Sequence, residues 1–193
     1  PKICSWLEKN TVKFDVVIVP DYGNGFISKN MIQKLCNHAR FLAINTQVNS
    51  GNRGYHSINR YPRADFVALN GPELRVATHN RHDSYEQLAK ELAEKMGADQ
   101  FAVTLGSKGA ILFDRDQNTV HKSPILSTKV LDRIGAGDTF LSLAGLCLGG
   151  GLKSEIALFV GSAAAALDVQ VVCNRKPIIP VNLYKYINTL LKS

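Results

Sequence analysis

The 193-residue chain is 45% hydrophobic and 20% charged, near the average of globular proteins, which excludes disordered, collagen-like and coiled-coil classes and predicts a single domain. Its 23 basic and 16 acidic residues give a formal net charge of +7, which favours an anionic partner, either a phosphorylated small molecule or nucleic acid. No apolar run reaches the length of a membrane span, and the four scattered cysteines form no Cys-x-x-Cys pair, so we expect a cytoplasmic protein without a membrane partner. Because the first residue is proline, we expect part of a longer translation product.

Three short apolar segments in the first half of the chain predict buried strands, at residues 15–19, 41–46 and 66–69. Ser28 is placed to cap a helix whose apolar residues recur on one face. These apolar residues are Met31, Ile32, Leu35 and Cys36. The polar segment 47–63 has no periodicity and predicts a long loop that is either functional or loosely ordered.

The second half of the chain begins with an amphipathic helix from Ser84 to Met96, which Gly97 is expected to stop. A further strand and a hairpin follow, at residues 101–105, 110–113 and 119–122. Three helices complete the pattern, over residues 138–148, 154–167 and 181–191. Strands that alternate with helices predict an α/β fold, in which a mostly parallel sheet carries helices on both faces.

The sharpest motif is the turn Gly135-Ala136-Gly137-Asp138, which delivers a carboxylate onto the first turn of a helix. The free amide groups of a helix start attract negative charge, and an aspartate there can accept a proton from a hydroxyl group during phosphoryl transfer. The same residues also suit an ordinary helix start, with an aspartate favoured by the helix dipole and glycines that only shape the turn.

Two further motifs follow directly after predicted strands. In Thr104-Leu-Gly106-Ser107-Lys108-Gly109, two glycines surround Lys108 where open α/β sheets bind nucleotides, although a tight turn before a hairpin explains the same residues. In Asn70-Gly-Pro-Glu73, an amide and a carboxylate three residues apart suit a hydrated Mg²⁺ ion, and they equally suit the capped first turn of a helix.

Taken together, these three motifs resemble the PfkB, or ribokinase-like, carbohydrate kinases in their order and approximate spacing. The resemblance extends from Asp15 to Leu191 and implies the nucleotide-binding C-terminal portion of that fold, with the N-terminal part absent. It also implies ATP and Mg²⁺ as cofactors and a sugar or sugar phosphate as substrate, and it leaves a homodimer open.

The resemblance further implies roles for individual residues. Asp138 is expected to be the catalytic base, and Gly135, Ala136 and Gly137 the anion hole. Asn70 and Glu73 are expected to serve Mg²⁺ through water, and the segment from Thr104 to Gly109 to lie along ATP. Gly106, Ser107 and Lys108 belong to this segment.

Within the family, the chain looks most like the heptose 7-phosphate kinase domain of ADP-heptose synthesis. The residues that carry this likeness are Asp21-Tyr-Gly-Asn-Gly25, Arg60-Tyr-Pro-Arg63-Ala-Asp65 and Asn174-Arg-Lys-Pro177. An already phosphorylated substrate would suit the basic loop, where Arg53, Arg60 and Arg63 could pair with a phosphate. A solvated basic loop is the alternative.

Two departures from the family pattern bear on activity. Arg133 stands where the family usually has a small hydroxyl residue, and Asn45-Thr-Gln-Val48 replaces an Asp-Pro-like sequence. A non-catalytic nucleotide-binding or interaction module therefore remains the alternative to a kinase. We do not expect a nucleic-acid partner, because too few aromatic residues lie among the basic ones.

Overall fold

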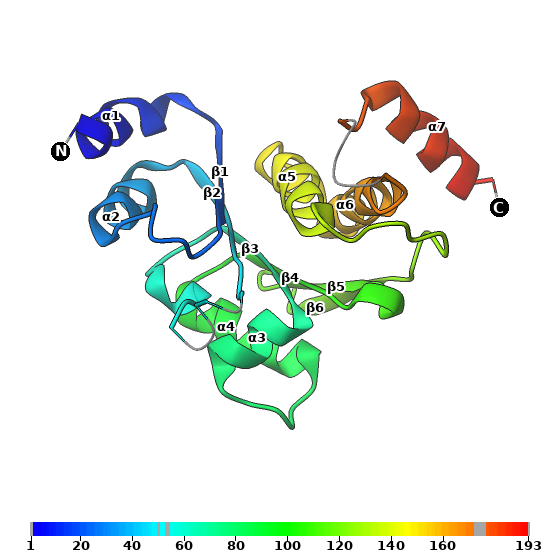
Figure 1. The fold of residues 1–193 in the computed structure, drawn as a ribbon, viewed down its shortest axis with the longest axis horizontal. Coiled ribbons are helices and arrows are strands. Elements are labelled where there is room, and N and C mark those ends of the chain that lie inside the picture. Colours follow the sequence, from blue (N-terminus) through cyan, green and yellow to red (C-terminus); the bar gives the residue numbers. More distant parts are fainter. Residues whose placement is uncertain (1, 50, 53–54, 172–176, 193) are drawn as a thin grey trace.

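A six-stranded sheet forms the centre of the protein in a computed structural model that describes residues 2–49, 51–52, 55–171 and 177–192. The strands are β1 (Val16–Asp21), β2 (Phe41–Thr46), β3 (Phe66–Asn70), β4 (Gln100–Thr104), β5 (Ala110–Asp114) and β6 (Thr119–Ser123). They lie side by side in the order of the sequence (Figure 1). β1 to β4 run parallel, β5 runs antiparallel to β4, and β6 runs antiparallel to β5. This confirms the predicted mostly parallel α/β sheet.

Helices cover both faces of this sheet, as Figure 1 shows. One face carries α2 (Lys29–His38), α3 (Gly71–Thr78) and α4 (Tyr85–Met96). The other carries α5 (Ala136–Gly149) and α6 (Ser154–Asp168), with α7 (Pro180–Leu190) packed on α6. α1 (Lys2–Asn10) lies beside α2, to which an ion pair of 2.9 Å between Glu8 and Lys34 connects it. Short 3-10 turns are formed by η1 (Thr11–Lys13), η2 (Ile58–Arg60) and η3 (Gly106–Lys108).

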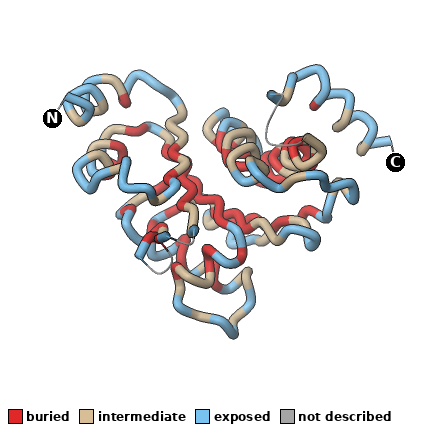
Figure 2. Tube along the Cα trace, viewed as in Figure 1, coloured by how far each residue is buried: buried red, intermediate tan, exposed pale blue. Residues whose placement is uncertain are grey.

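Two large core clusters lie one on each face of the sheet, with the buried strands between them (Figure 2), and a smaller third cluster lies between α6 and α7. Along β3, Val67 packs with the residues of α2, α3 and α4, whereas Phe66 and Ala68 pack with those of α5 and α6. Neighbouring strand residues point to opposite faces, so a strand covered on both faces needs apolar residues at every position. That requirement explains the uninterrupted apolar runs of the sequence.

The helix α5 lies close to the sheet because small residues face each other. A Cβ atom added to Gly145 would lie 3.1 Å from the Cβ atom of Ala43 in β2. On the other side of α5, a Cβ atom added to Gly161 of α6 would lie 3.0 Å from that of Ala144. Contacts this tight leave little room for a side chain, so α5 is held between the sheet and α6.

The predicted helix starts are confirmed by their caps. The Ser28 hydroxyl accepts a hydrogen bond from the amide of Met31, and the Ser84 hydroxyl accepts one from Gln87. Gly97 ends α4 with a φ of +64°. The helix α1 was not expected, whereas α3, with eight residues, begins at the capped helix start that the Asn70–Glu73 motif left open as an alternative. Among the described residues, no helix is both long and apolar enough to cross a membrane.

The segment 47–63 is a packed loop in its described part. Four of its side chains are buried, those of Asn52, His56, Ile58 and Tyr61. Two of these four are polar, so the order of the loop comes from internal hydrogen bonds as well as from apolar packing. Of the two readings that the sequence left open, the loosely ordered loop is wrong for these residues.

Gly109, between β4 and β5, provides a test of the fold. It has a φ of +82°, and an added Cβ atom would lie 2.1 Å from the backbone oxygen of Ser123. We expect Gly109→Ala to lower the free energy of unfolding by about 2 to 4 kcal/mol, measured by urea denaturation. Gly106→Ala is the matched control: it also has a positive φ, but its methyl group meets nothing within 4 Å, so its loss should be nearer 1 kcal/mol. Equal losses would contradict this account.

Candidate active site

The motifs singled out in the sequence gather at the edge of the sheet where the parallel strands end. Asp21 ends β1, Asn70 ends β3 and Thr104 ends β4. Asn70 and Thr104 are register partners, so their motifs are neighbours. In open α/β sheets, ligands bind at this carboxyl edge because the loops that leave it can converge on one space.

The Gly135–Asp138 turn forms the start of α5 as the sequence predicted. Gly135 precedes the helix with a φ of +92°, a conformation that favours glycine, and its carbonyl accepts the amide of Thr139. Ala136 and Gly137 open the helix, and Asp138 lies in its first turn. The first amides of a helix have no partner inside it, so this turn presents donors for an anion.

The loop before α5 is fastened to the end of α6. The amides of Leu131 and Asp132 both donate to the carbonyl of Val169, and a carboxylate oxygen of Asp132 accepts the amide of Ile134. Arg133, the departure from the family pattern, is exposed on this loop. The turn is thus anchored on both sides of the arginine.

The Asp138 carboxylate is hydrogen-bonded on both oxygens by residues from other strand ends. The hydroxyl of Tyr22 donates to Oδ2 over 2.8 Å, and the amide of Gln47 donates to Oδ1 over 3.3 Å. The hydrogen bond to Asp138 is the main reason why the pKa of Tyr22 is raised, and burial adds to the effect. Sequence reasoning missed both Tyr22 and Gln47 as site residues. Gln47 directly follows the predicted strand 41–46, and Tyr22 lies three residues after the predicted strand 15–19.

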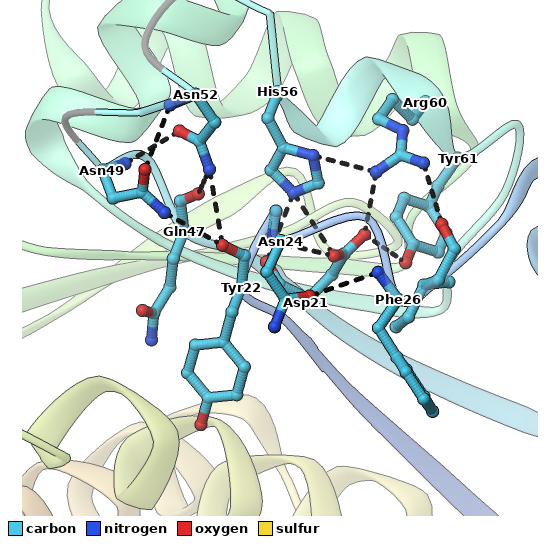
Figure 3. Close-up of polar contacts among 12 residues, drawn as sticks. Asp21, Tyr22, Asn24, Phe26, Gln47, Asn49, Asn52, His56, Arg60 and Tyr61 are labelled. Carbon is cyan, nitrogen blue, oxygen red and sulfur yellow. Dashed lines mark hydrogen bonds and ion pairs between the residues drawn. The ribbon is translucent and has the colours of Figure 1, made fainter.

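Behind these donors lies a buried carboxylate, that of Asp21, whose side chain is only 2% exposed. It accepts hydrogen bonds from the hydroxyl of Tyr61 at 2.9 Å, from Arg60 at 3.3 Å and from the amide of Gly23 at 3.1 Å (Figure 3). His56 Nε2 lies 3.4 Å from the same carboxylate. Burial and the neighbouring charge of Asp21 raise the pKa of Tyr61. A buried carboxylate is stable only with such partners, so it ties the loop 47–63 to the end of β1.

The loops that follow β1 and β2 are also joined through their backbones. The amide of Gln47 donates to the carbonyl of Asp21 over 2.9 Å. The side chain of Asn52 donates to the carbonyls of Gln47 and Tyr22, and Asn49 donates to the same Tyr22 carbonyl (Figure 3). The backbones of Tyr22 and Gln47, the two residues that donate to Asp138, therefore belong to one hydrogen-bond network.

The two predicted substrate arginines lie at opposite edges of the sheet. Arg60 lies at the carboxyl edge, where its guanidinium contacts Asp21, His56 and the carbonyl of Ile27. These contacts use three of its five N–H donors.

Arg63 is not brought to the candidate site. Its guanidinium pairs with Asp65, just before β3, and donates to the carbonyls of Cys36 and Ala39 at the end of α2. The charge pattern of the sequence could not distinguish the two edges. Arg53 and residues 174–176 of the Asn174–Pro177 motif lie outside the described residues.

Asn70 and Glu73 form a capping box at the start of α3. The Asn70 side chain accepts the amide of Glu73 over 2.8 Å, and the Glu73 carboxylate accepts the amide of Asn70 over 2.9 Å. Glu73 is 6% exposed, and burial raises the pKa of its carboxyl group, while hydrogen bonds from Asn70, Val48 and Asn45 oppose this shift. Both side chains are thus engaged in this capping box and Glu73 is buried, so the pair does not fit direct coordination of Mg²⁺. No cluster of three or more metal-binding side chains occurs among the described residues.

The Thr104–Gly109 segment leaves β4 and forms η3. Ser107 and Lys108 are exposed, and Gly106 is exposed between them and the strand. The carbonyl of Gly109 accepts the amide of Leu105, which closes the turn into β5. The turn therefore offers exposed backbone and one lysine at the carboxyl edge, next to Asn70.

A cavity of about 360 Å³ adjoins Asp138 on the side of α6. Asp168 lines it with only 5% of its surface exposed, and no hydrogen-bond partner for its Oδ2 atom occurs among the described residues. Burial raises the pKa of Asp168, while a hydrogen bond from Thr139 opposes the shift. The other lining residues are Thr139, Ser142, Leu143, Pro177 and Ile178.

Two curated relatives illustrate the sequence similarity. The bifunctional protein HldE of Aliarcobacter butzleri is 28% identical over 195 residues, which cover 100% of this chain and 40% of the relative. A ribokinase of Arabidopsis thaliana is 36% identical over 109 residues, which cover 55% of this chain and 29% of the relative. The chain therefore spans less than half the length of its HldE relative.

Solved structures share the fold. The structure of Arabidopsis thaliana ribokinase complexed with ribose and ATP matches with a TM-score of 0.73 and 24% identity, over 93% of this chain and 58% of that one. Phosphofructokinase-2 from Escherichia coli matches with a TM-score of 0.77 and 15% identity, over 98% of this chain and 62% of that one. At these identities the likeness shows a ribokinase-like fold.

The family model for the pfkB family carbohydrate kinases matches residues 18–179. This match covers most of the chain and includes the carboxyl edge from Asp21 to Asp138 and the cavity beside α6. The resemblance inferred from the three motifs is thereby confirmed, and the chain belongs to the pfkB family of carbohydrate kinases.

Proposed function

We propose that the protein containing this chain transfers the γ-phosphoryl group of ATP to a hydroxyl group of a sugar or sugar phosphate, with Asp138 as the general base. The observation that carries the proposal is the position of Asp138, in the first turn of α5 directly after Gly135, at the carboxyl edge of the sheet. A carboxylate at this point can accept the proton of the attacking hydroxyl group. The amides of the same turn, at Gly135, Ala136 and Gly137, would stabilise the charge that develops on the phosphoryl group.

ATP would lie along the exposed turn from Thr104 to Gly109, where Lys108 can meet a phosphate. Mg²⁺ would supply charge neutralisation on the phosphates, held mainly by the nucleotide and by water, with Asn70 within reach through water. Much of the sugar pocket would come from the part of the protein that this chain does not span, because the chain covers 40% of its HldE relative.

A finer proposal concerns the sugar, which we propose to be phosphorylated already, as in a heptose 7-phosphate. The likeness to the heptose 7-phosphate kinase domain supports it, and so does the position of Arg60 at the carboxyl edge. Its side chain is 32% exposed, and two of its N–H donors are not used by the contacts described above. Arg63 is left out of this proposal because it lies at the other edge.

Asp138→Asn in the full-length protein tests the general base. We expect turnover to fall by about 10² to 10⁴, because a general base accelerates proton transfer and adds little to ground-state binding. ATP affinity, measured by calorimetry, should stay within about threefold. Asp116→Asn, at an exposed turn, is the matched control and should keep normal turnover. Normal turnover in Asp138→Asn would rule out the mechanism.

Glu73→Gln tests whether Glu73 serves the metal or the helix cap. Glutamine can keep the capping box. Burial raises the pKa of Glu73 above its usual 4.5, so the fold loses stability when the carboxyl group ionises as the pH rises through the raised pKa, and glutamine avoids this loss. We expect Glu73→Gln to unfold at higher denaturant concentration than the wild type near pH 7, with the difference shrinking toward pH 4.

Glu73→Ala keeps the Asn70 cap but lacks the carboxylate that accepts the Asn70 amide, and it should lose about 0.5 to 2 kcal/mol of stability. The Mg²⁺ concentration for half-maximal turnover should stay within about twofold in Glu73→Gln. A tenfold increase would instead identify Glu73 as a metal-serving residue.

Arg60→Ala tests the phosphorylated sugar. Loss of a charge-assisted hydrogen bond to phosphate should raise KM for the sugar phosphate by about tenfold or more, and KM for ATP far less. Arg63→Ala is the matched control, since it also breaks an arginine–aspartate pair and should lower stability, but at the opposite edge. Equal effects of Arg60→Ala on both KM values would refute the sugar-phosphate proposal and leave the kinase intact.

A further inference from the structure

The Asp138 carboxylate receives one side-chain hydrogen bond on each oxygen, and both donors come from loops far away in sequence. Tyr22 follows β1 and Gln47 follows β2, whereas Asp138 opens α5. Their bonds of 2.8 Å and 3.3 Å are the contacts through which the three segments meet at this point. A carboxylate offers about four lone-pair positions, so these two bonds leave positions for a substrate hydroxyl group.

Both donors are held in place from behind, which shows that their contact with Asp138 is built into the fold. The Tyr22 carbonyl accepts hydrogen bonds from Asn49 and Asn52, so the residue is fixed on the side away from its hydroxyl group (Figure 3). The backbone of Gln47 donates to Asp21 and accepts from Asn52. The tyrosine hydroxyl and the glutamine amide therefore approach Asp138 from fixed points.

The charge around Tyr22 keeps it a donor. Its pKa is raised, first by the hydrogen bond to Asp138, then by burial and by the negative charge of that carboxylate. Tyr22 thus holds its proton and offers it to Asp138.

We propose that Tyr22 and Gln47 are positioning residues, which hold the Asp138 carboxylate in one orientation and leave its remaining lone pairs to the substrate hydroxyl group. This inference rests on the proposed function, in which Asp138 is the base. A base that turns away from its substrate is unproductive for part of the time, so loss of a donor should lower turnover more than binding.

The kinetic test uses Tyr22→Phe and Gln47→Glu in the full-length protein. Tyr22→Phe removes only the hydroxyl group, and we expect kcat to fall about tenfold while KM for ATP stays within about twofold. Gln47→Glu keeps the shape of the side chain but places a like charge beside Asp138, so its kcat should fall further. Tyr184→Phe, on the exposed side of α7, is the matched control and should keep normal kcat.

The second test needs no enzyme activity. Absorbance at about 295 nm follows tyrosine ionisation, and the difference between the wild type and Tyr22→Phe isolates Tyr22. Repeating the titration in an Asp138→Asn background should move the ionisation of Tyr22 to lower pH, because the neutral amide no longer opposes the phenolate.

The outcomes distinguish the positioning role of Tyr22 and Gln47 from the proposed kinase function. An active enzyme in which Tyr22→Phe and Gln47→Glu keep normal kcat would overturn the positioning role alone. An unchanged Tyr22 titration in Asp138→Asn would overturn the contact itself. Absence of kinase activity in the wild type, with ATP, Mg²⁺ and a panel of sugars and sugar phosphates, would overturn the proposed function and with it the catalytic meaning of the contact.

Discussion

The buried carboxylate of Asp21 is the interaction on which the candidate site depends. A carboxylate that is almost fully removed from water needs charged and hydrogen-bonding partners, and here they come from Arg60, His56 and Tyr61. These partners fix the path of the loop after β2, which returns across the end of β1. Gln47 lies at the start of that loop, and the tyrosine that follows Asp21 points at the helix on the other face of the sheet. One buried charge thus organises the approach of three separate segments.

The strands could be predicted because both faces of the sheet are buried, which requires apolar residues at successive positions. The structure of the loop 47–63 could not be predicted in the same way, because its order comes from buried polar groups such as Asn52 and His56, which follow no sequence period. The short helix α3 was left as an alternative for another reason. Asn70 and Glu73 suit both a metal site and a capping box, and the structure shows the capping box.

The proposed base could be singled out from local sequence, since a glycine turn before Asp138 is a local feature. Its partners were not, because the contacts of Tyr22 and Gln47 with Asp138 join residues 116 and 91 positions apart. The arginines illustrate a related limit. Arg60 and Arg63 are three residues apart, yet one reaches the carboxyl edge and the other turns to the end of α2, according to which aspartate is near. Charge in a sequence indicates a class of partner, whereas the fold decides where that charge acts.

The close packing of α5 extends the site well beyond its visible residues. Gly145 lies two turns along the helix from Asp138, about 10 Å away at 1.5 Å per residue, and touches β2 with no side chain between. A methyl group added there would lie 3.1 Å from the Cβ atom of Ala43, so α5 or the strand would have to shift by a few tenths of an ångström. With Asp138 as the proposed base, such a shift would move its carboxylate relative to Tyr22 and Gln47, so the reaction rate would depend partly on how close α5 lies to the sheet. A substitution at such a position would change the rate while every residue around the substrate stays the same.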